Sequence, residues 1–75
     1  MTYYKFNNQD ITIDIIMKIE QVVRILSENM NMPFDKMLGK FYDSRTYKNL
    51  HNIESGLWAE SAEFIADDYL IETTR

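Results

Sequence analysis

The sequence predicts an all-α protein, a small orthogonal bundle of three to four helices. Two observations lead to this fold class. The 75 residues include only two glycines and one proline, which leaves little room for hairpin turns or long loops. Apolar residues also recur at three- and four-residue steps, the spacing of amphipathic helices. We therefore expect one domain, residues 1–75, with helices over about 10–30, 33–43, 45–51 and 61–72.

The first nine residues (1–9) are expected to form a flexible N-terminal arm, because Asn7 and Asn8 disfavour regular structure. Asp10 then caps a long first helix, since its carboxylate can accept hydrogen bonds from the free N–H groups of the first turn. The core-facing stripe of this helix consists of Ile11, Ile15, Ile19, Val22, Leu26 and Met30, widened by Ile16, Val23 and Ile25. This helix is predicted to be the centre of the bundle.

Start signals define the remaining helices. Pro33 suits the first turn of the second helix, where its missing N–H is not needed. The predicted core face of that helix consists of Phe34, Met37, Leu38 and Phe41. Ser44 is the expected cap of the third helix and Ser61 that of the last, with Gly56 in the turn between them. A start of the last helix near Ser55 remains as an alternative.

Negative charge is concentrated at the C-terminal end. From Asn49 to Thr74 the chain has no lysine or arginine. The same segment carries six acidic residues: Glu54, Glu60, Glu63, Asp67, Asp68 and Glu72. The preceding residues are close to balanced, so the net charge of -4 belongs mainly to this end. Such an asymmetry indicates a basic partner and argues against a nucleic-acid backbone.

Two apolar residues of the last helix point away from its core face. Phe64 and Ile71, seven residues apart, lie on the side opposite Ile65 and Tyr69. An apolar strip among carboxylates is typical of an interface, with an anchor that fills a pocket and a charged rim. The predicted partner-binding residues are Glu60, Glu63, Phe64, Asp67, Asp68 and Ile71. The alternative is that Trp58 covers Phe64 and the acids only solvate the helix.

The first helix has a similar feature. Ile13 and Met17 fall on its polar side and lie next to each other, four residues apart. They are a possible oligomer contact, for example in a homodimer. Alternatively the Tyr3–Phe6 arm or a neighbouring helix covers them within one chain.

Signals for catalysis or metal binding are weak. The chain has no cysteine, which excludes disulfides and thiolate metal sites. His51 and Glu54 have a helical ligand spacing, but two ligands do not make a metal site. Asp67 and Asp68 are adjacent, so their carboxylates diverge on a helix. We expect no enzyme activity, no metal and no cofactor.

Nucleic acid and membranes are also disfavoured as partners. Four basic residues of the second and third helices, Lys36, Lys40, Arg45 and Lys48, could be drawn as a helix-turn-helix surface. Asp35 and Asp43 dilute it, so nucleic acid is expected only within a larger complex. No stretch approaches the ~18 apolar residues that span a bilayer. The N-terminus is too polar for a signal peptide, and we expect a cytoplasmic protein.

Two segments carry a resemblance to known proteins: Phe41-x-x-Ser44-x-Thr46-Tyr47-x-x-Leu50 and Glu54-x-Gly56-Leu57-Trp58-x-x-Ser61-x-Glu63-Phe64-Ile65. The pattern resembles small uncharacterised helical proteins of bacteria and their mobile elements, of the kind encoded beside toxin-like genes. It covers most of residues 10–72 and concerns hydrophobic and capping positions. Ala62 departs from it, because such proteins often have proline there. The resemblance implies the fold and, by association only, an antitoxin or immunity role.

These patterns together predict a non-enzymatic protein-binding module. It would act as an antitoxin, immunity protein or phage-type inhibitor that docks its acidic C-terminal helix on the basic surface of another protein. One alternative is a homo-oligomeric structural protein assembled through the first helix. The other is a DNA-binding regulator that uses the basic second and third helices.

Overall fold

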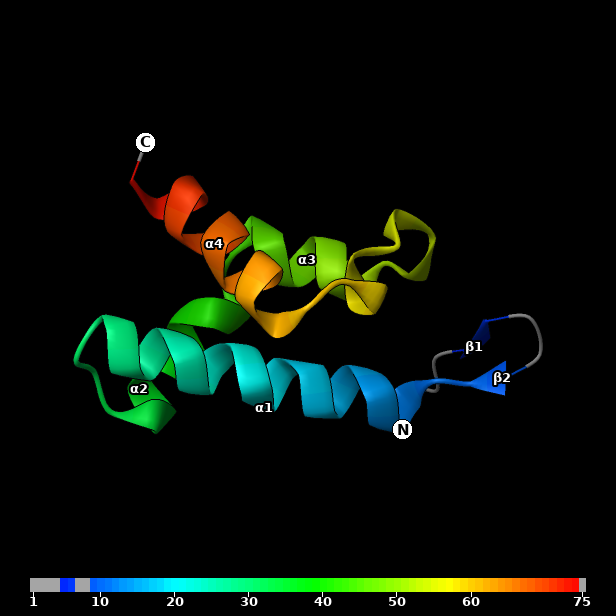
Figure 1. Cartoon of the computed structure of the whole chain (residues 1–75), viewed down its shortest axis with the longest axis horizontal. Helices are drawn as coiled ribbons and strands as arrows, with labels where there is room; N and C mark the ends of the chain where they lie inside the picture. The colour runs from blue at the N-terminus through cyan, green and yellow to red at the C-terminus, as the bar shows by residue number, and fades with distance from the viewer. Residues whose placement is uncertain (1–4, 7–8, 75) are drawn as a thin grey trace.

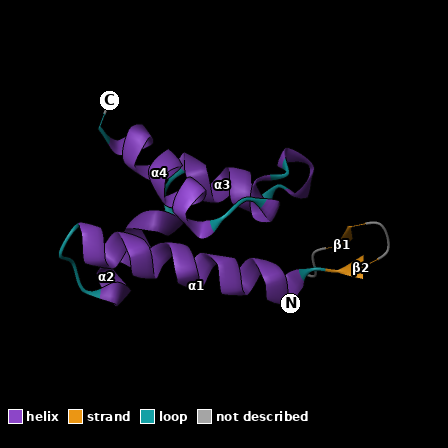
Figure 2. Cartoon of the chain, in the orientation of Figure 1, coloured by secondary structure: helices purple, strands orange, loops and turns teal. Residues whose placement is uncertain are grey.

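The computed structural model describes residues 5–6 and 9–74, and four α-helices make up most of this part (Figures 1 and 2). They are α1 (Thr12–Asn29), α2 (Phe34–Tyr42), α3 (Arg45–His51) and α4 (Ala62–Thr73). Two 3-10 turns, Ile53–Ser55 and Leu57–Ala59, connect α3 to α4. The predicted all-α bundle is confirmed. In Figure 1, α1 runs along the long axis, α2 crosses behind its C-terminal half, and α3 and α4 lie along its other side.

A short hairpin precedes α1. Strand β1 (Lys5–Phe6) pairs antiparallel with β2 (Gln9–Asp10), with Lys5 opposite Asp10. The predicted arm therefore includes two paired segments, while Tyr3 and Tyr4 lie outside the described residues. The predicted packing of the arm over Ile13 and Met17 also depends on residues outside the described part.

Helix α1 begins two residues after the predicted start, at Thr12. Asp10 still satisfies an N–H group of the first turn, because its Oδ1 accepts a hydrogen bond of 2.9 Å from the Thr12 N–H. Asp10 is the last residue of β2, and Ile11 occupies the cap position of α1. Pro33 likewise occupies the cap position of α2 and precedes its first residue, Phe34.

The other start signals are confirmed. The Ser44 hydroxyl accepts a hydrogen bond from the Tyr47 N–H, and the Ser61 hydroxyl accepts one from the Phe64 N–H. Ser61 therefore caps the last helix, which begins at Ala62 and not near Ser55. Gly56 has a φ of 73°, a left-handed conformation that allows the sharp turn between the two 3-10 segments.

The core is formed by one face of each helix. Its buried residues are Val22, Val23, Leu26, Met37, Phe41, Leu50, Leu57, Ala62, Ile65, Ala66 and Tyr69. Phe41 lies at its centre, fully buried, with its ring centroid 5.8 Å from those of both Tyr47 and Tyr69. Helices α1 and α4 supply most of the other buried residues of the core.

Three residues predicted to face the core are exposed. Ile16 is 48% exposed, and Met30 and Phe34 are also on the surface. Ile16 lines a shallow groove beside Phe34 and Tyr42 of α2, so it lies at the edge of the α1–α2 contact and not beneath it. Met30 and Phe34 flank the turn between α1 and α2, where one side of each residue meets solvent.

Candidate protein-interaction surface

The exposed side of α4 and the residue just before its cap combine two apolar side chains with four acidic ones. Phe64 is 49% exposed and Ile71 is 55% exposed, about 10 Å apart along the helix axis. They lie opposite Ile65 and Tyr69, which are buried in the core. We call Phe64, Ile71 and the acidic residues Glu60, Glu63, Asp67 and Asp68 the α4 ridge. Neither Trp58 nor any other group seals Phe64 inside the protein.

The carboxylates of the ridge are available to a partner. Glu60, Glu63 and Asp67 are exposed, and Asp68 is half-buried beside α3. Within residues 5–6 and 9–74, none of these four carboxylates forms a salt bridge. Since α4 contains no lysine or arginine, nothing on the helix itself neutralises them. The ridge therefore presents uncompensated negative charge around an apolar centre.

Lys18 fixes the position of the segment that leads into the ridge. Its ammonium group donates a hydrogen bond of 2.6 Å to the backbone carbonyl of Glu60. This bond connects α1 to the residue just before the Ser61 cap, and it leaves the Glu60 carboxylate exposed. This contact to the Glu60 backbone adds to the packing of Ala62 in the core and helps to hold the start of α4 against α1.

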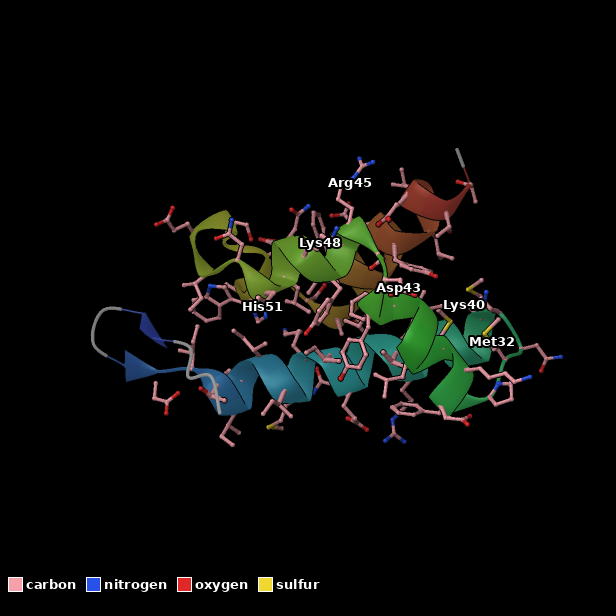
Figure 3. All side chains as sticks on the ribbon, turned by 180° about the vertical axis from the view of Figure 1, so that it is seen from behind. Met32, Lys40, Asp43, Arg45, Lys48 and His51 are labelled. Carbon is pink, nitrogen blue, oxygen red and sulfur yellow. The ribbon has the colours of Figure 1, made fainter. Side chains whose placement is uncertain are left out.

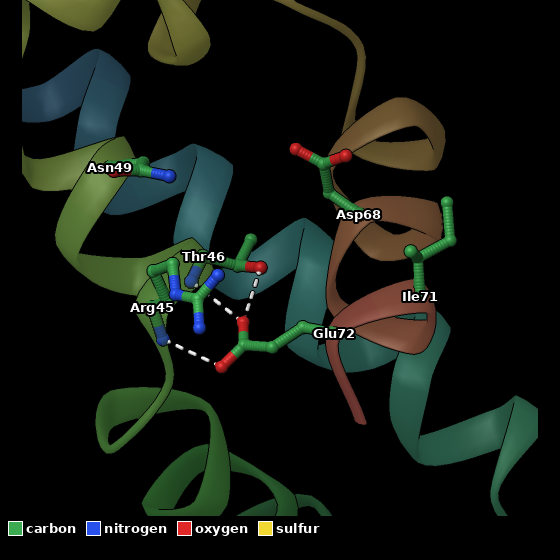
Figure 4. A pocket seen from close by; sticks show the side chains of 6 residues that line it. All are labelled: Arg45, Thr46, Asn49, Asp68, Ile71 and Glu72. Carbon is green, nitrogen blue, oxygen red and sulfur yellow. Dashed lines mark hydrogen bonds between the residues drawn. The ribbon is translucent and has the colours of Figure 1, made fainter. Parts of the chain in front are cut away.

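Glu72 has a different role from the other acidic residues of α4. Its carboxylate accepts hydrogen bonds from the Arg45 N–H at 2.8 Å, the Thr46 N–H at 2.9 Å and the Thr46 hydroxyl at 2.8 Å (Figure 4). Burial alone would raise the pKa of Glu72. The bonds from the Arg45 and Thr46 backbone, the Thr46 hydroxyl and the Arg45 charge together lower that pKa below its ordinary value of 4.5. Glu72 therefore stabilises the start of α3.

A groove of about 250 Å³ separates α3 from α4 next to the ridge. It is lined by Arg45, Thr46, Asn49, Asp68, Ile71 and Glu72. Figure 4 shows the Asp68 carboxylate directed toward the side of α3, while Arg45 and Glu72 lie together at the other end. Asp68 and Ile71 thus belong to both the groove and the ridge, so a molecule on the ridge can also reach into the groove.

The remaining predicted residues are also on the surface. Ile13 is 66% exposed and Met17 is 54% exposed, so both side chains lie on the surface. The basic residues Lys36, Lys40, Arg45 and Lys48 are exposed on α2 and α3. Figure 3 shows Lys40 on α2 apart from Arg45 and Lys48 on α3, with Asp43 between the two helices.

Two features of the surface were absent from the sequence-based prediction. Glu72 was counted only as part of the acidic end, because its partners lie 26 and 27 residues away in the chain. Ile16 and Phe34 were placed in the core, although they extend the exposed apolar surface of Ile13 and Met17. No local sequence signal marks either feature, since both depend on how the helices cross.

The described residues show neither a cluster of metal ligands nor a helix that could span a membrane. Residues 5–6 and 9–74 contain no group of three or more His, Asp or Glu side chains placed to hold a metal ion. None of the helices in the same part combines the length and apolar character that crossing a bilayer requires.

A comparison of the chain with protein-family models, curated proteins and solved structures finds no match. The resemblance to small toxin-neighbour proteins stays a prediction.

Proposed function

We propose that this protein is a non-enzymatic binding module that docks the α4 ridge on a basic surface of another protein. The observation that carries the proposal is the exposure of Phe64 and Ile71 among carboxylates without salt bridges in the described chain. Burying the exposed half of each apolar side chain would contribute about 1 kcal/mol per residue. The carboxylates would increase the association rate and select a basic partner.

The ridge has the arrangement that a protein interface needs. Phe64 and Ile71 form a central apolar strip, and Asp67 and Asp68 lie on its two sides. In a complex, lysine or arginine side chains of the partner would pair with these carboxylates while the strip fills an apolar depression. A role as an antitoxin, immunity protein or phage-type inhibitor in the cytoplasm is consistent with such a contact, because covering a basic cleft blocks it.

Binding to DNA has weaker support. In a helix-turn-helix arrangement, the start of α3 would enter the major groove between the two phosphate backbones. The Glu72 carboxylate occupies that end of α3 and would repel a phosphate group. The exposed Asp43 between α2 and α3 adds further negative charge.

The proposal is tested by affinity capture from the native host with three forms of the protein. The wild-type chain should retain a partner with a basic surface, and retention should weaken as salt is added. A Phe64→Ala, Asp67→Lys variant should lose that partner because both the anchor and the charge are removed. Glu54→Lys makes the same charge change at an exposed residue outside α4 and should retain the partner.

Circular dichroism of all three forms separates loss of binding from loss of folding. Each substituted side chain is exposed, so the helical signal should be the same. Equal capture by the ridge variant and the wild type would show that α4 is not the binding surface.

A further inference from the structure

Five of the eight large apolar residues exposed in the described chain lie on α1 and α2. They are Ile13, Ile16 and Met17 on α1, and Phe34 and Tyr42 on α2, with exposed fractions of 39% to 66%. We call these five residues the α1–α2 face. The α4 ridge has only two exposed residues of this kind, so the face is the more apolar of the two surfaces.

The face is continuous across the two helices. Ile13 is three residues from Ile16 and four from Met17, so it is a neighbour of both on the outer side of α1. Met17 also lines a second groove together with Lys18 and Trp58. Ile16 also lines a shallow groove of about 200 Å³ together with Phe34 and Tyr42. Ile19 and Leu38 line the same groove and are partly buried against the core. Ile16 therefore connects the outer side of α1 to the exposed rings of α2.

We propose that a second copy of this chain covers the α1–α2 face, forming a symmetric homodimer. About half of each of the five residues is exposed, so the face presents on the order of 500 Å². Two such faces together reach the roughly 1,000 Å² that a specific protein interface requires. In a two-fold dimer the same residues lie on both sides, and each apolar face meets an apolar face.

Charge also favours this face for contact between copies. Each chain has a net charge of -4, and its acidic end would repel that of a second copy. On the outer side of α1, Glu20 and Arg24 form an ion pair with each other. Glu20 is the single charged residue that lines the groove. Since Glu20 is already paired with Arg24, two grooves can face each other without placing two unpaired negative charges in contact.

The dimer would leave α4 exposed in each copy. Phe64 and Ile71 belong to α4, while all five residues of the face belong to α1 and α2. A dimer would thus carry two α4 ridges and could bind a repetitive or dimeric partner with increased avidity. The dimer does not depend on the proposed function of the ridge, and each can be tested without the other.

Sedimentation equilibrium of the purified chain tests the dimer directly. The wild type should shift from monomer to dimer between micromolar and millimolar concentrations. Ile13→Lys should weaken self-association by at least about tenfold, because it buries an unpaired charge in the interface. Ile71→Lys makes the same substitution at a similarly exposed residue of α4 and should leave the dimer intact or tighten it.

A cross-linking experiment gives a second measure, which can trap even a weak dimer as a covalent product. The chain has no cysteine, so a single introduced thiol reacts alone. With a flexible bis-maleimide, Met17→Cys should form covalent dimers far more efficiently than Ile71→Cys. A wild type that stays monomeric at millimolar concentration would overturn the proposal and leave the face to another occupant. Equal behaviour of the α1 and α4 variants in both experiments would also overturn it.

Discussion

The Glu72 carboxylate and the first turn of α3 are joined by hydrogen bonds from the Thr46 N–H and the Thr46 hydroxyl, at 2.9 Å and 2.8 Å. Ser44 occupies the cap position of α3, yet its hydroxyl accepts only the Tyr47 N–H. Glu72 satisfies the N–H groups of Arg45 and Thr46 that Ser44 leaves free. The start of α3 is therefore capped in part by the last turn of α4.

Removing this contact should destabilise the protein. We expect Glu72→Ala to lower the free energy of unfolding by about 1–2 kcal/mol, because it leaves N–H groups of a helix start without a partner. Urea denaturation followed by circular dichroism measures the change. Glu54→Ala removes an exposed carboxylate outside α4 and should change stability by less than about 0.5 kcal/mol. Equal losses for the two variants would contradict the capping role of Glu72.

The same carboxylate should make stability depend on acid pH. The pKa of Glu72 is lowered in the folded protein, so its contribution is complete above its unfolded value of 4.5. That contribution is lost as the pH falls through the lower, folded pKa. Wild-type stability should therefore decrease more steeply below pH 4.5 than that of Glu72→Gln. Parallel curves for the two proteins over this acid range would contradict the assignment.

The two glycines should respond to alanine in opposite directions. Gly56 has a φ of 73°, so Gly56→Ala should cost about 1 kcal/mol of stability through backbone strain. Gly39 lies inside α2, where an added β-carbon would meet no atom of the rest of the protein within 4 Å. Gly39→Ala should therefore stabilise the protein by about 0.5–1 kcal/mol. Thermal unfolding of both variants checks the signs, and a stabilising Gly56→Ala would contradict the turn conformation.

The two serine caps should differ in their contribution. Ser44 is buried, and its hydroxyl also donates a hydrogen bond of 2.6 Å to the Phe41 carbonyl. Ser44→Ala therefore removes two hydrogen bonds and should cost about 2 kcal/mol. Ser61 is exposed and makes the single cap bond to the Phe64 N–H, so Ser61→Ala should cost about 1 kcal/mol or less. Chemical denaturation of both variants would show the order, and the reverse order would contradict it.

Local chemistry explains which parts of the fold could be predicted from the sequence. Ser44, Gly56 and Ser61 act within a few residues of themselves, and their roles as caps and turn were predicted correctly. The helical period also separated outward from inward residues on α4, since Phe64 and Ile71 are exposed while Ile65 and Tyr69 are buried. These features depend on dihedral preferences and on a fixed rotation per residue.

The remaining features depend on how the helices cross. Ile16 fits the apolar stripe of α1, yet it lies in a shallow groove beside Phe34 and Tyr42, so it stays exposed. Glu72 looks like one more acid of α4, and only the packing of α4 beside α3 brings it to Thr46. Asp10 was predicted to cap the first helix, but β2 ends at Asp10, and Ile11 occupies the cap position. Local sequence patterns do not reveal how the helices cross, so these features could not be predicted from them.

The packing of α1 against α4 affects how the chain can fold during its synthesis. The core is complete only when Ile65 and Tyr69 of α4 meet Val22 and Leu26 of α1. While α4 is still inside the ribosome exit tunnel, α2 can cover only part of the apolar stripe of α1. The core therefore closes only after α4 has emerged. Until then the exposed apolar residues of α1 make the nascent chain a substrate for chaperones and proteases.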